Sequence, residues 1–252
     1  TKISTMLEKF GFGDYTNIDI HEESRAILPS VEWKKNRYNK PWYTGETLSV
    51  GIGQSYLTST PLQLAQATSI LVNRGQIKIP HFLDATSQAQ LINTGKGFTK
   101  ETIKETVFYE DKPPIILKNP AHWDIVLDAM HKTVQRVGAT AYAPFLGTRY
   151  DAAGKTGSAQ VASIKEGEKY DAKKTQENKR DNAMFIAFAP YEAPEILVVV
   201  AIENVAKGGG ASNAAPVARQ IMDQYFGNRI INSTDPEKHP NHNNIYLQNN
   251  RH

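Results

Sequence analysis

The sequence predicts a mixed α/β fold of the α+β type, in which helices cover both faces of an antiparallel sheet. Two nearly continuous apolar runs, residues 183–189 and 195–202, are rich in β-branched residues and are separated by a short proline-bounded turn. Such runs predict two antiparallel strands. Because neither run alternates with polar residues, both faces of the sheet are expected to be covered, which requires helices on each side.

Four helices are expected around these strands, and the first two have clear ends. Residues 1–10 carry an apolar face and stop at Gly11. The second helix begins at Thr60, which is a good N-cap. Pro61 suits the first helical position, and Gln63 completes a capping box with Thr60. These signals predict a helix start without reference to the rest of the chain.

The third helix is expected from Asn119 to about Gly138, and the fourth from near Asn213 to Gly227. Apolar spacing predicts an inner face for the third helix made of Val126, Ala129, Met130, Val134 and Val137. The same spacing predicts an inner face for the fourth made of Val217, Ile221 and Tyr225. The three glycines at 208–210, just before the fourth helix, are expected to be flexible.

Residues 11–47 are expected to form an irregular loop in which cations alternate with aromatic residues. Interleaving of this kind occurs in sites that bind single-stranded nucleic acid or stack on sugars. A solvated loop pinned by a few buried aromatic side chains is the commoner arrangement, and we favour it. The dense mixed charge of residues 163–181 predicts a long solvated connection, and residues 228–252 are expected to form a flexible tail.

The stretch from Gly154 to Val161 is the main candidate for a functional strand. In a strand, Lys155 and Gly157 face one way, whereas Thr156 and Ser158 face the other. All four can serve one site only along the edge of the sheet, where an extended peptide ending in a carboxylate would find backbone groups, hydroxyls and a cation. Gly157 would let the backbone of such a ligand come close.

A phosphate-binding P-loop is a remote alternative for the same stretch. That motif needs a glycine five residues before Gly154, and Arg149 stands there instead. The residues after Gly157 also lack the helical period that a P-loop requires. The net charge of +3 gives no reason to expect nucleic acid, and the absence of cysteine excludes disulfides and thiolate metal sites. No apolar run approaches the length of a membrane span.

Four stretches together resemble a known family. Lys155-Thr-Gly157 matches one of the three motifs that mark penicillin-binding proteins and class A β-lactamases. The stretches 28–33, 49–65 and 208–219 are similar to class B penicillin-binding proteins of the elongation type, the penicillin-binding protein 2 group. The order and spacing agree over residues 1–227. The resemblance therefore implies the C-terminal part of a transpeptidase domain, with the penicillin-binding and β-lactamase-like fold.

The other two family motifs, Ser-x-x-Lys and Ser-x-Asn, occur nowhere in the 252 residues. The family carries both upstream of the position that matches Thr1, so we expect the chain to be a fragment, with an incomplete domain and no activity on its own. The parent would be a serine-type D-Ala-D-Ala transpeptidase that cross-links peptidoglycan stem peptides and is a target of β-lactams. A catalytically inactive module of penicillin-binding type that serves as a scaffold is the alternative.

The resemblance also implies roles, partners and a location. Lys155 would supply positive charge to the catalytic site, the Thr156 hydroxyl would bind the substrate carboxylate, and the Ser158 N–H would line the oxyanion hole. Stem peptides, β-lactam antibiotics, the N-terminal part of the same protein and a rod-shape-determining protein are the expected partners, and no cofactor or metal is expected. The parent would act at the periplasmic face of the bacterial inner membrane.

Overall fold

The computed structural model describes residues 2–20, 22–82, 112–161, 171, 173 and 175–229. The chain forms two compact units, residues 1–126 and 127–252, which we consider in turn. Most of the 163–181 connection and almost all of the expected tail at 228–252 lie outside the described residues.

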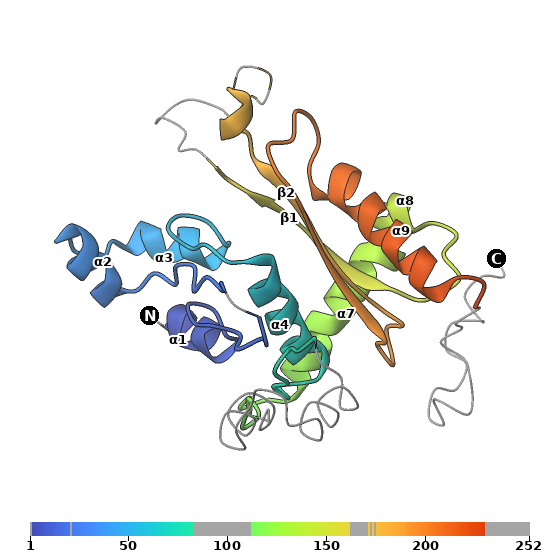
Figure 1. Ribbon diagram of the computed structural model, residues 1–252, viewed down its shortest axis with the longest axis horizontal. Coiled ribbons are helices and arrows are strands. Elements are labelled where there is room, and N and C mark those ends of the chain that lie inside the picture. Colours follow the sequence, from blue (N-terminus) through green and yellow to red (C-terminus); the bar gives the residue numbers. More distant parts are fainter. Residues whose placement is uncertain are drawn as a thin grey trace, which may run out of the picture. The chain divides into compact units, whose positions relative to one another are not determined.

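The first unit is helical. Its elements are α1 (Lys2–Lys9), α2 (Val31–Tyr38), α3 (Thr44–Gly51), α4 (Pro61–Val72) and the first part of α7 (Ala121–Gln135), all labelled in Figure 1. Its buried cluster consists of Ile70, Ile115 and Trp123, with Phe10 packed against it. The rings of Phe10 and Trp123 are 6.0 Å apart, so the residue that follows α1 is held by a residue of α7.

The predicted start of α4 is confirmed. Thr60 Oγ1 accepts a hydrogen bond from the Gln63 N–H at 3.1 Å, and Gln63 Oε1 accepts one from the Thr60 N–H at 3.0 Å. The chain then reverses at Gly75, whose φ is +95°. A Cβ at Gly75 would lie 2.3 Å from the Ile115 carbonyl oxygen, so only glycine fits this turn.

The prediction of an irregular loop over residues 11–47 is wrong in part, because α2 lies within that range and α3 begins at Thr44. Neither helix has the apolar stripe that a sequence pattern reveals. Instead, Ser30 Oγ caps α2 by accepting from the Trp33 N–H, and Glu46 accepts from the Tyr43 N–H at the start of α3. A buried ion pair between Lys34 and Glu46 then joins the two helices.

Three aromatic residues of this region pack on one another. Trp33 lies 5.7 Å from Tyr38 and 5.2 Å from Tyr56, measured between ring centroids, and the two tyrosines are 5.6 Å apart. The favoured prediction, a solvated loop pinned by buried aromatic side chains, is therefore met only in part: the rings pack on one another, but the backbone is helical, Trp33 and Tyr56 are only partly buried and Tyr38 is exposed.

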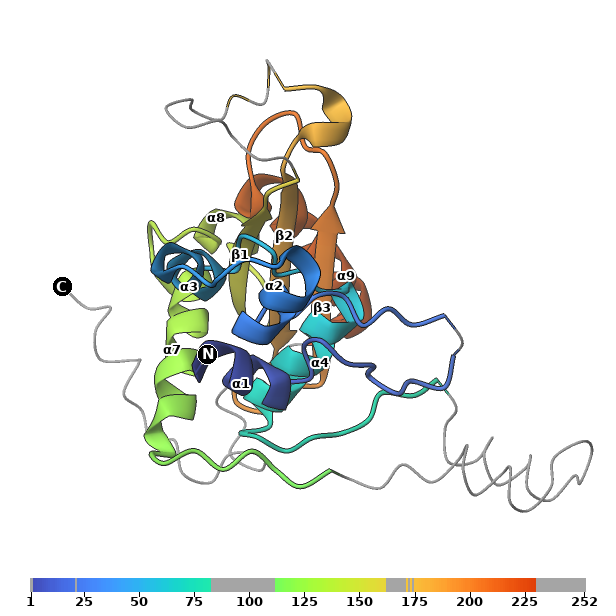
Figure 2. The same ribbon diagram turned by 90° about the vertical axis from the view of Figure 1, so that its left-hand side faces the viewer.

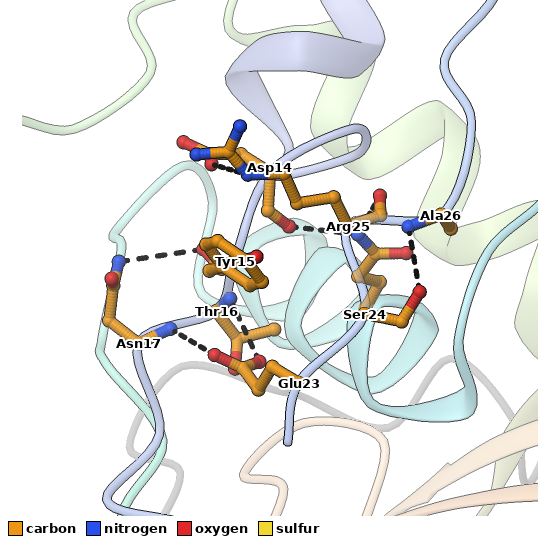
Figure 3. A network of polar contacts seen from close by, with 9 residues as sticks. Asp14, Tyr15, Thr16, Asn17, Glu23, Ser24, Arg25 and Ala26 are labelled. Carbon is orange, nitrogen blue, oxygen red and sulfur yellow. Dashed lines mark hydrogen bonds and ion pairs between the residues drawn. The ribbon is translucent and has the colours of Figure 1, made fainter. Parts of the chain in front are cut away.

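A polar network closes the segment between α1 and α2 (Figure 3). The Glu23 carboxylate accepts hydrogen bonds from the backbone N–H groups of Thr16 and Asn17, both at 3.0 Å. The amide nitrogen of Gln63, in α4, donates to the carbonyl oxygens of Asp14 and Arg25, both at 2.9 Å. Gln63 therefore joins its own helix cap to both sides of this loop.

The second unit is built on a three-stranded antiparallel sheet in the order β1-β2-β3. Its strands are β1 (Ala153–Ala159), β2 (Asn182–Ala189) and β3 (Ile196–Ile202). The predicted antiparallel pair is thus confirmed, with Phe185 opposite Val200. The rest of α7, the short helices α8 (Tyr142–Phe145) and η1 (Glu177–Lys179), a π-helical turn η2 (Gly210–Ala214) and α9 (Ala215–Phe226) complete the unit.

Helices α8 and α9 lie against one face of this sheet (Figure 1). The ring of Phe145 in α8 packs 5.6 Å from Phe185 of β2, and Arg219 of α9 donates to the carbonyl oxygens of Pro144 and Leu146. Tyr150 OH donates to the Asp223 carboxylate at 2.9 Å. Burial and this carboxylate together raise the pKa of Tyr150, so its hydroxyl stays protonated as a donor.

The predicted inner faces of the third and fourth helices need correction. In α9 the buried residues are Ala215, Ala218, Met222 and Phe226, whereas Val217, Ile221 and Tyr225 are 38%, 44% and 46% exposed. Around α7, Met130 and Val134 are buried as predicted, together with Trp123 and Leu127, whereas Val126, Ala129 and Val137 (which lies beyond the end of the helix) are exposed. In α9 two adjacent stripes are apolar, and the sheet accepts the one whose small residues, Ala215 and Ala218, allow close approach.

Candidate active-site strand

The register of β1 places its side chains as the sequence predicted. Thr156 pairs with Phe185 and Ser158 with Ala183, both fully buried residues on the face that α9 covers. Lys155 pairs with Ile186 and therefore lies on the opposite face. Thr156 and Ser158 are thus on one face, and Lys155 and Gly157 are on the other.

Strand β1 is at the edge of the sheet formed by the described residues, which is the position that a shared site requires (Figure 2). The exposed Lys155 ammonium donates to the Thr156 carbonyl oxygen at 2.7 Å. A carbonyl that the long Lys155 side chain can reach in this way is turned to the outer edge of the strand. The edge therefore combines a cation, backbone polar groups and two hydroxyls, which is suitable chemistry for a peptide with a terminal carboxylate.

The two glycines of β1 differ in what they contact. A Cβ at Gly154 would lie 2.7 Å from the Phe185 ring and 2.7 Å from the Ile186 carbonyl oxygen, so packing alone requires glycine there. A Cβ at Gly157 would lie 3.4 Å from Met184 Cβ, which is an ordinary contact. Packing therefore does not explain Gly157, and its predicted role at a ligand remains a prediction.

The glycine loop at 208–210 is held in place beside this strand, although the sequence predicted a flexible connection. The Asn213 amide nitrogen donates to the carbonyl oxygens of Lys207 and Gly209, at 3.0 and 3.1 Å. A Cβ at Gly209 would lie 3.5 Å from Ser158 Oγ. The run of three glycines and the family resemblance of residues 208–219 drew attention to this loop, but nothing in its sequence indicates a neighbour fifty residues away.

A second feature that the sequence did not indicate supports the start of β1. His131 Nε2 lies 2.8 Å from Asp151 Oδ1, and the His131 ring stacks on Tyr191 with 4.2 Å between centroids. The Tyr191 N–H donates to the Asp151 carbonyl oxygen at 2.9 Å. These contacts join α7 and the turn after β2 to the residue two positions before β1.

Two other kinds of site are not found in the described part of the chain. No group of three or more histidine and acidic side chains there could hold a metal ion. None of the helices in these residues is both long and apolar enough to cross a bilayer. The P-loop alternative is wrong, because β1 continues as a strand through Ala159 where that motif needs a helix.

The comparison with protein families matches residues 1–223 to the penicillin-binding protein transpeptidase domain. The chain belongs to this transpeptidase family. Its fold class is that of the family: helices with an antiparallel sheet, here as part of a domain. The similarity extends over nearly all of the two units described above.

Individual relatives indicate which group within the family the chain is similar to. The chain is 42% identical over 229 residues to a Haemophilus influenzae protein named peptidoglycan D,D-transpeptidase MrdA, covering 91% of this chain and 33% of that protein. It is 37% identical over 223 residues to the Escherichia coli K12 protein of the same name, covering 88% of this chain and 33% of that protein. The chain therefore spans about a third of the length of these relatives.

Solved structures agree with this placement. The crystal structure of Pseudomonas aeruginosa PBP2 in complex with WCK 5153 matches with a TM-score of 0.71 and 34% identity, covering 90% of this chain and 44% of that one. A Helicobacter pylori PBP2, solved in complex with MreC, matches with a TM-score of 0.70 and 25% identity, covering 89% and 35%. The resemblance to the penicillin-binding protein 2 group is thus confirmed.

Proposed function

We propose that this chain supplies the lysine–threonine–glycine strand of a peptidoglycan D,D-transpeptidase that acts in cell-wall elongation. The observation that carries the proposal is the placement of Lys155, Thr156 and Ser158 along an exposed sheet edge in a chain of the transpeptidase family. The relatives named as D,D-transpeptidases support it. The nucleophilic serine of a Ser-x-x-Lys motif belongs to a part of the protein outside these 252 residues.

The reaction needs two displacements at one carbonyl. The serine hydroxyl attacks the carbonyl of the penultimate D-Ala and gives its proton to the adjacent base. The base passes this proton to the nitrogen of the terminal D-Ala, which leaves as the free amino acid. An amine of a second stem peptide then attacks the acyl-enzyme, forms the cross-link and returns the serine. The Ser158 N–H donates to the oxyanion in both steps, together with the N–H of the serine itself.

The side chains of β1 bind and orient the donor peptide. The Thr156 hydroxyl donates to the terminal carboxylate, and Ser158 Oγ assists it. The Lys155 ammonium moves from the Thr156 carbonyl to face the carboxylate and the proton relay, which its long, exposed side chain permits. Gly157 leaves room for the peptide backbone at the strand. β-Lactams acylate the same serine because they present an equivalent carbonyl and carboxylate.

The same proposal includes partners and a location. A rod-shape-determining protein is a fitting partner, since a Helicobacter pylori PBP2 has been solved in complex with MreC. The remainder of the same polypeptide completes the domain. The enzyme acts at the periplasmic face of the inner membrane, where peptidoglycan is built. An inactive scaffold of the same fold is the competing possibility, and acylation distinguishes it.

The experiment is acylation of the full-length protein by a fluorescent penicillin. We expect labelling of the wild type and none of the isolated 252-residue chain, which has no Ser-x-x-Lys. Thr156→Val should slow acylation roughly ten- to a hundredfold, since a hydrogen bond to a charged group is worth about 1.5–3 kcal/mol. Lys155→Ala should slow it most. Ser158→Ala should slow it least, because alanine keeps the backbone N–H.

The melting temperatures of the three variants separate binding from structure. All three residues are at the edge of the sheet, so the melting temperatures should barely change. Unchanged acylation in Lys155→Ala would refute the catalytic assignment of β1. A wild-type protein that folds but takes no label would instead favour the scaffold.

A further inference from the structure

Gly210 lies directly on the hydrogen-bonding ladder between β1 and β2. A Cβ at this position would be 2.1 Å from the Met184 carbonyl oxygen, 3.0 Å from the Gly157 carbonyl oxygen and 3.1 Å from the Gly157 nitrogen. Cβ atoms do not come within 3.0 Å of such neighbours, and the neighbours here are backbone atoms that no rotamer change can move aside. The contact therefore requires glycine at 210.

The atoms beneath Gly210 indicate how β1 is oriented. Gly157 and Met184 are partners in the antiparallel register, and their backbone polar atoms gather at one point under the loop. In an antiparallel pair, residues whose polar groups face the partner strand alternate with residues whose groups face away. The backbone groups of Thr156 and Ser158 therefore face the outer edge, as the contact of Lys155 with the Thr156 carbonyl also indicates.

The loop that carries Gly210 is itself well fixed. The Asn213 amide bridges the carbonyl oxygens of Lys207 and Gly209, and the Gly209 N–H donates to Ser212 Oγ at 3.2 Å. The turn continues without a break into α9, whose first residue, Ala215, is fully buried. The position of Gly210 on the ladder is thus set by a helix packed on the sheet.

We propose that Gly210 is a positioning residue. Its backbone packs directly on the Gly157–Met184 pair and so holds the outward-facing N–H of Ser158 in line with the reacting carbonyl. The inference rests on the proposed function, because the position of the Ser158 N–H matters only if that N–H is an oxyanion donor. An oxyanion hole works only when its donors are fixed before the charge develops. A small rotation of the Gly157–Ser158 peptide would therefore slow acylation without removing any functional group.

The test compares two neighbouring glycines in the full-length protein. Gly210→Ala should lower the acylation rate constant for a fluorescent penicillin at least about tenfold, since loss of one oxyanion donor typically lowers rates about a hundred- to a thousandfold. Gly209→Ala is the matched control. Its new Cβ would meet Ser158 Oγ at an ordinary 3.5 Å, and its φ of −146° suits alanine, so its rate should stay within about twofold of wild type.

The readout is the rate constant together with the labelled fraction at saturation. A variant that merely folds poorly loses labelled fraction, and its folded molecules still react at the normal rate. Gly210→Ala should instead reach nearly full labelling slowly, with little change in the dissociation constant of the initial complex. A Gly210→Ala protein that labels at the wild-type rate overturns the proposal.

Asn213→Ala provides a second test that introduces no clash. It removes the three hydrogen bonds that the Asn213 amide donates within the loop, so the rate constant should fall about threefold or more, in keeping with the modest net worth of such bonds. If Gly210→Ala does not fold, an unchanged rate in Asn213→Ala overturns the proposal by itself. If the proposed function itself is wrong, the wild type takes no label, and this outcome differs from an unchanged rate in the variants.

Discussion

The same substitution at two glutamines one turn apart in α4 should affect the stability of the protein in different directions. Gln63 and Gln66 are both buried, with exposed fractions of 1% and 7%. Gln63 accepts from the Thr60 N–H and donates to the carbonyl oxygens of Asp14 and Arg25. Gln66 Oε1 is buried and accepts no hydrogen bond from the described residues. Replacement of each glutamine by leucine nearly conserves its volume and removes its polar group.

The expected magnitudes follow from these partners. Gln63→Leu removes half of a capping box, a loss of about 1 kcal/mol. It also leaves two carbonyl groups without their donor, at about 1 kcal/mol each, because both belong to exposed residues that water can partly reach. The total is about 3 kcal/mol. Gln66→Leu removes an unsatisfied buried oxygen and should be neutral or stabilising.

Thermal unfolding of both variants in the full-length protein tests this reasoning. At about 2–4 °C per kcal/mol, Gln63→Leu should lower the melting temperature of the unit that contains it by about 6–12 °C. Gln66→Leu should leave it unchanged or raise it. Equal losses in the two variants would mean that leucine is simply misfitted in this helix, and the polar contacts of Gln63 would then not be what holds the loop.

Two further predictions concern packing and charge. Met222→Ala should destabilise the second unit by about 2–5 kcal/mol, whereas Ile221→Ala, its half-exposed neighbour, should cost less than about 1 kcal/mol, and equal losses in chemical denaturation would contradict the observed face of α9. Burial raises the pKa of Glu46, but the hydrogen bonds from the Lys34 ammonium and the Tyr43 N–H, with the Lys34 charge, leave that pKa below its ordinary value. The pair therefore contributes stability above the unfolded-state pKa of about 4.3, and this is lost as the pH falls through the folded-state pKa. Glu46→Gln should lower the melting temperature at pH 7 and converge with wild type under acid conditions, and a gap that does not depend on pH would refute the charge assignment.

The sequence was most informative where the signal is local. The capping box of Thr60 and Gln63 involves residues three apart, so its geometry follows from the backbone of one helical turn. The apolar runs of β2 and β3 and the short turn between them specify an antiparallel pair in the same way. The alternation along β1 also follows from strand geometry, and this was enough to predict that Lys155 and Thr156 face opposite sides.

Tertiary structure decided the features that depend on residues distant in the sequence. The helices α2 and α3 are stabilised by capping side chains and by a buried pair between Lys34 and Glu46, which no apolar period reveals. In α9, the stripes ending in Tyr225 and in Phe226 are both apolar, and contact with the sheet selected the one that contains Ala215 and Ala218.

The glycine loop shows the same limit at the candidate site. Three successive glycines indicate backbone freedom, and from the sequence alone a flexible connection is the natural interpretation. In the structure, the bare Cα of Gly210 instead permits contact with the ladder between β1 and β2. The side of the strand on which Lys155, Thr156 and Ser158 each lie was therefore evident from the sequence. The neighbours that hold that strand in place were decided by packing, because close approach of two backbones leaves no trace in the pattern of either segment.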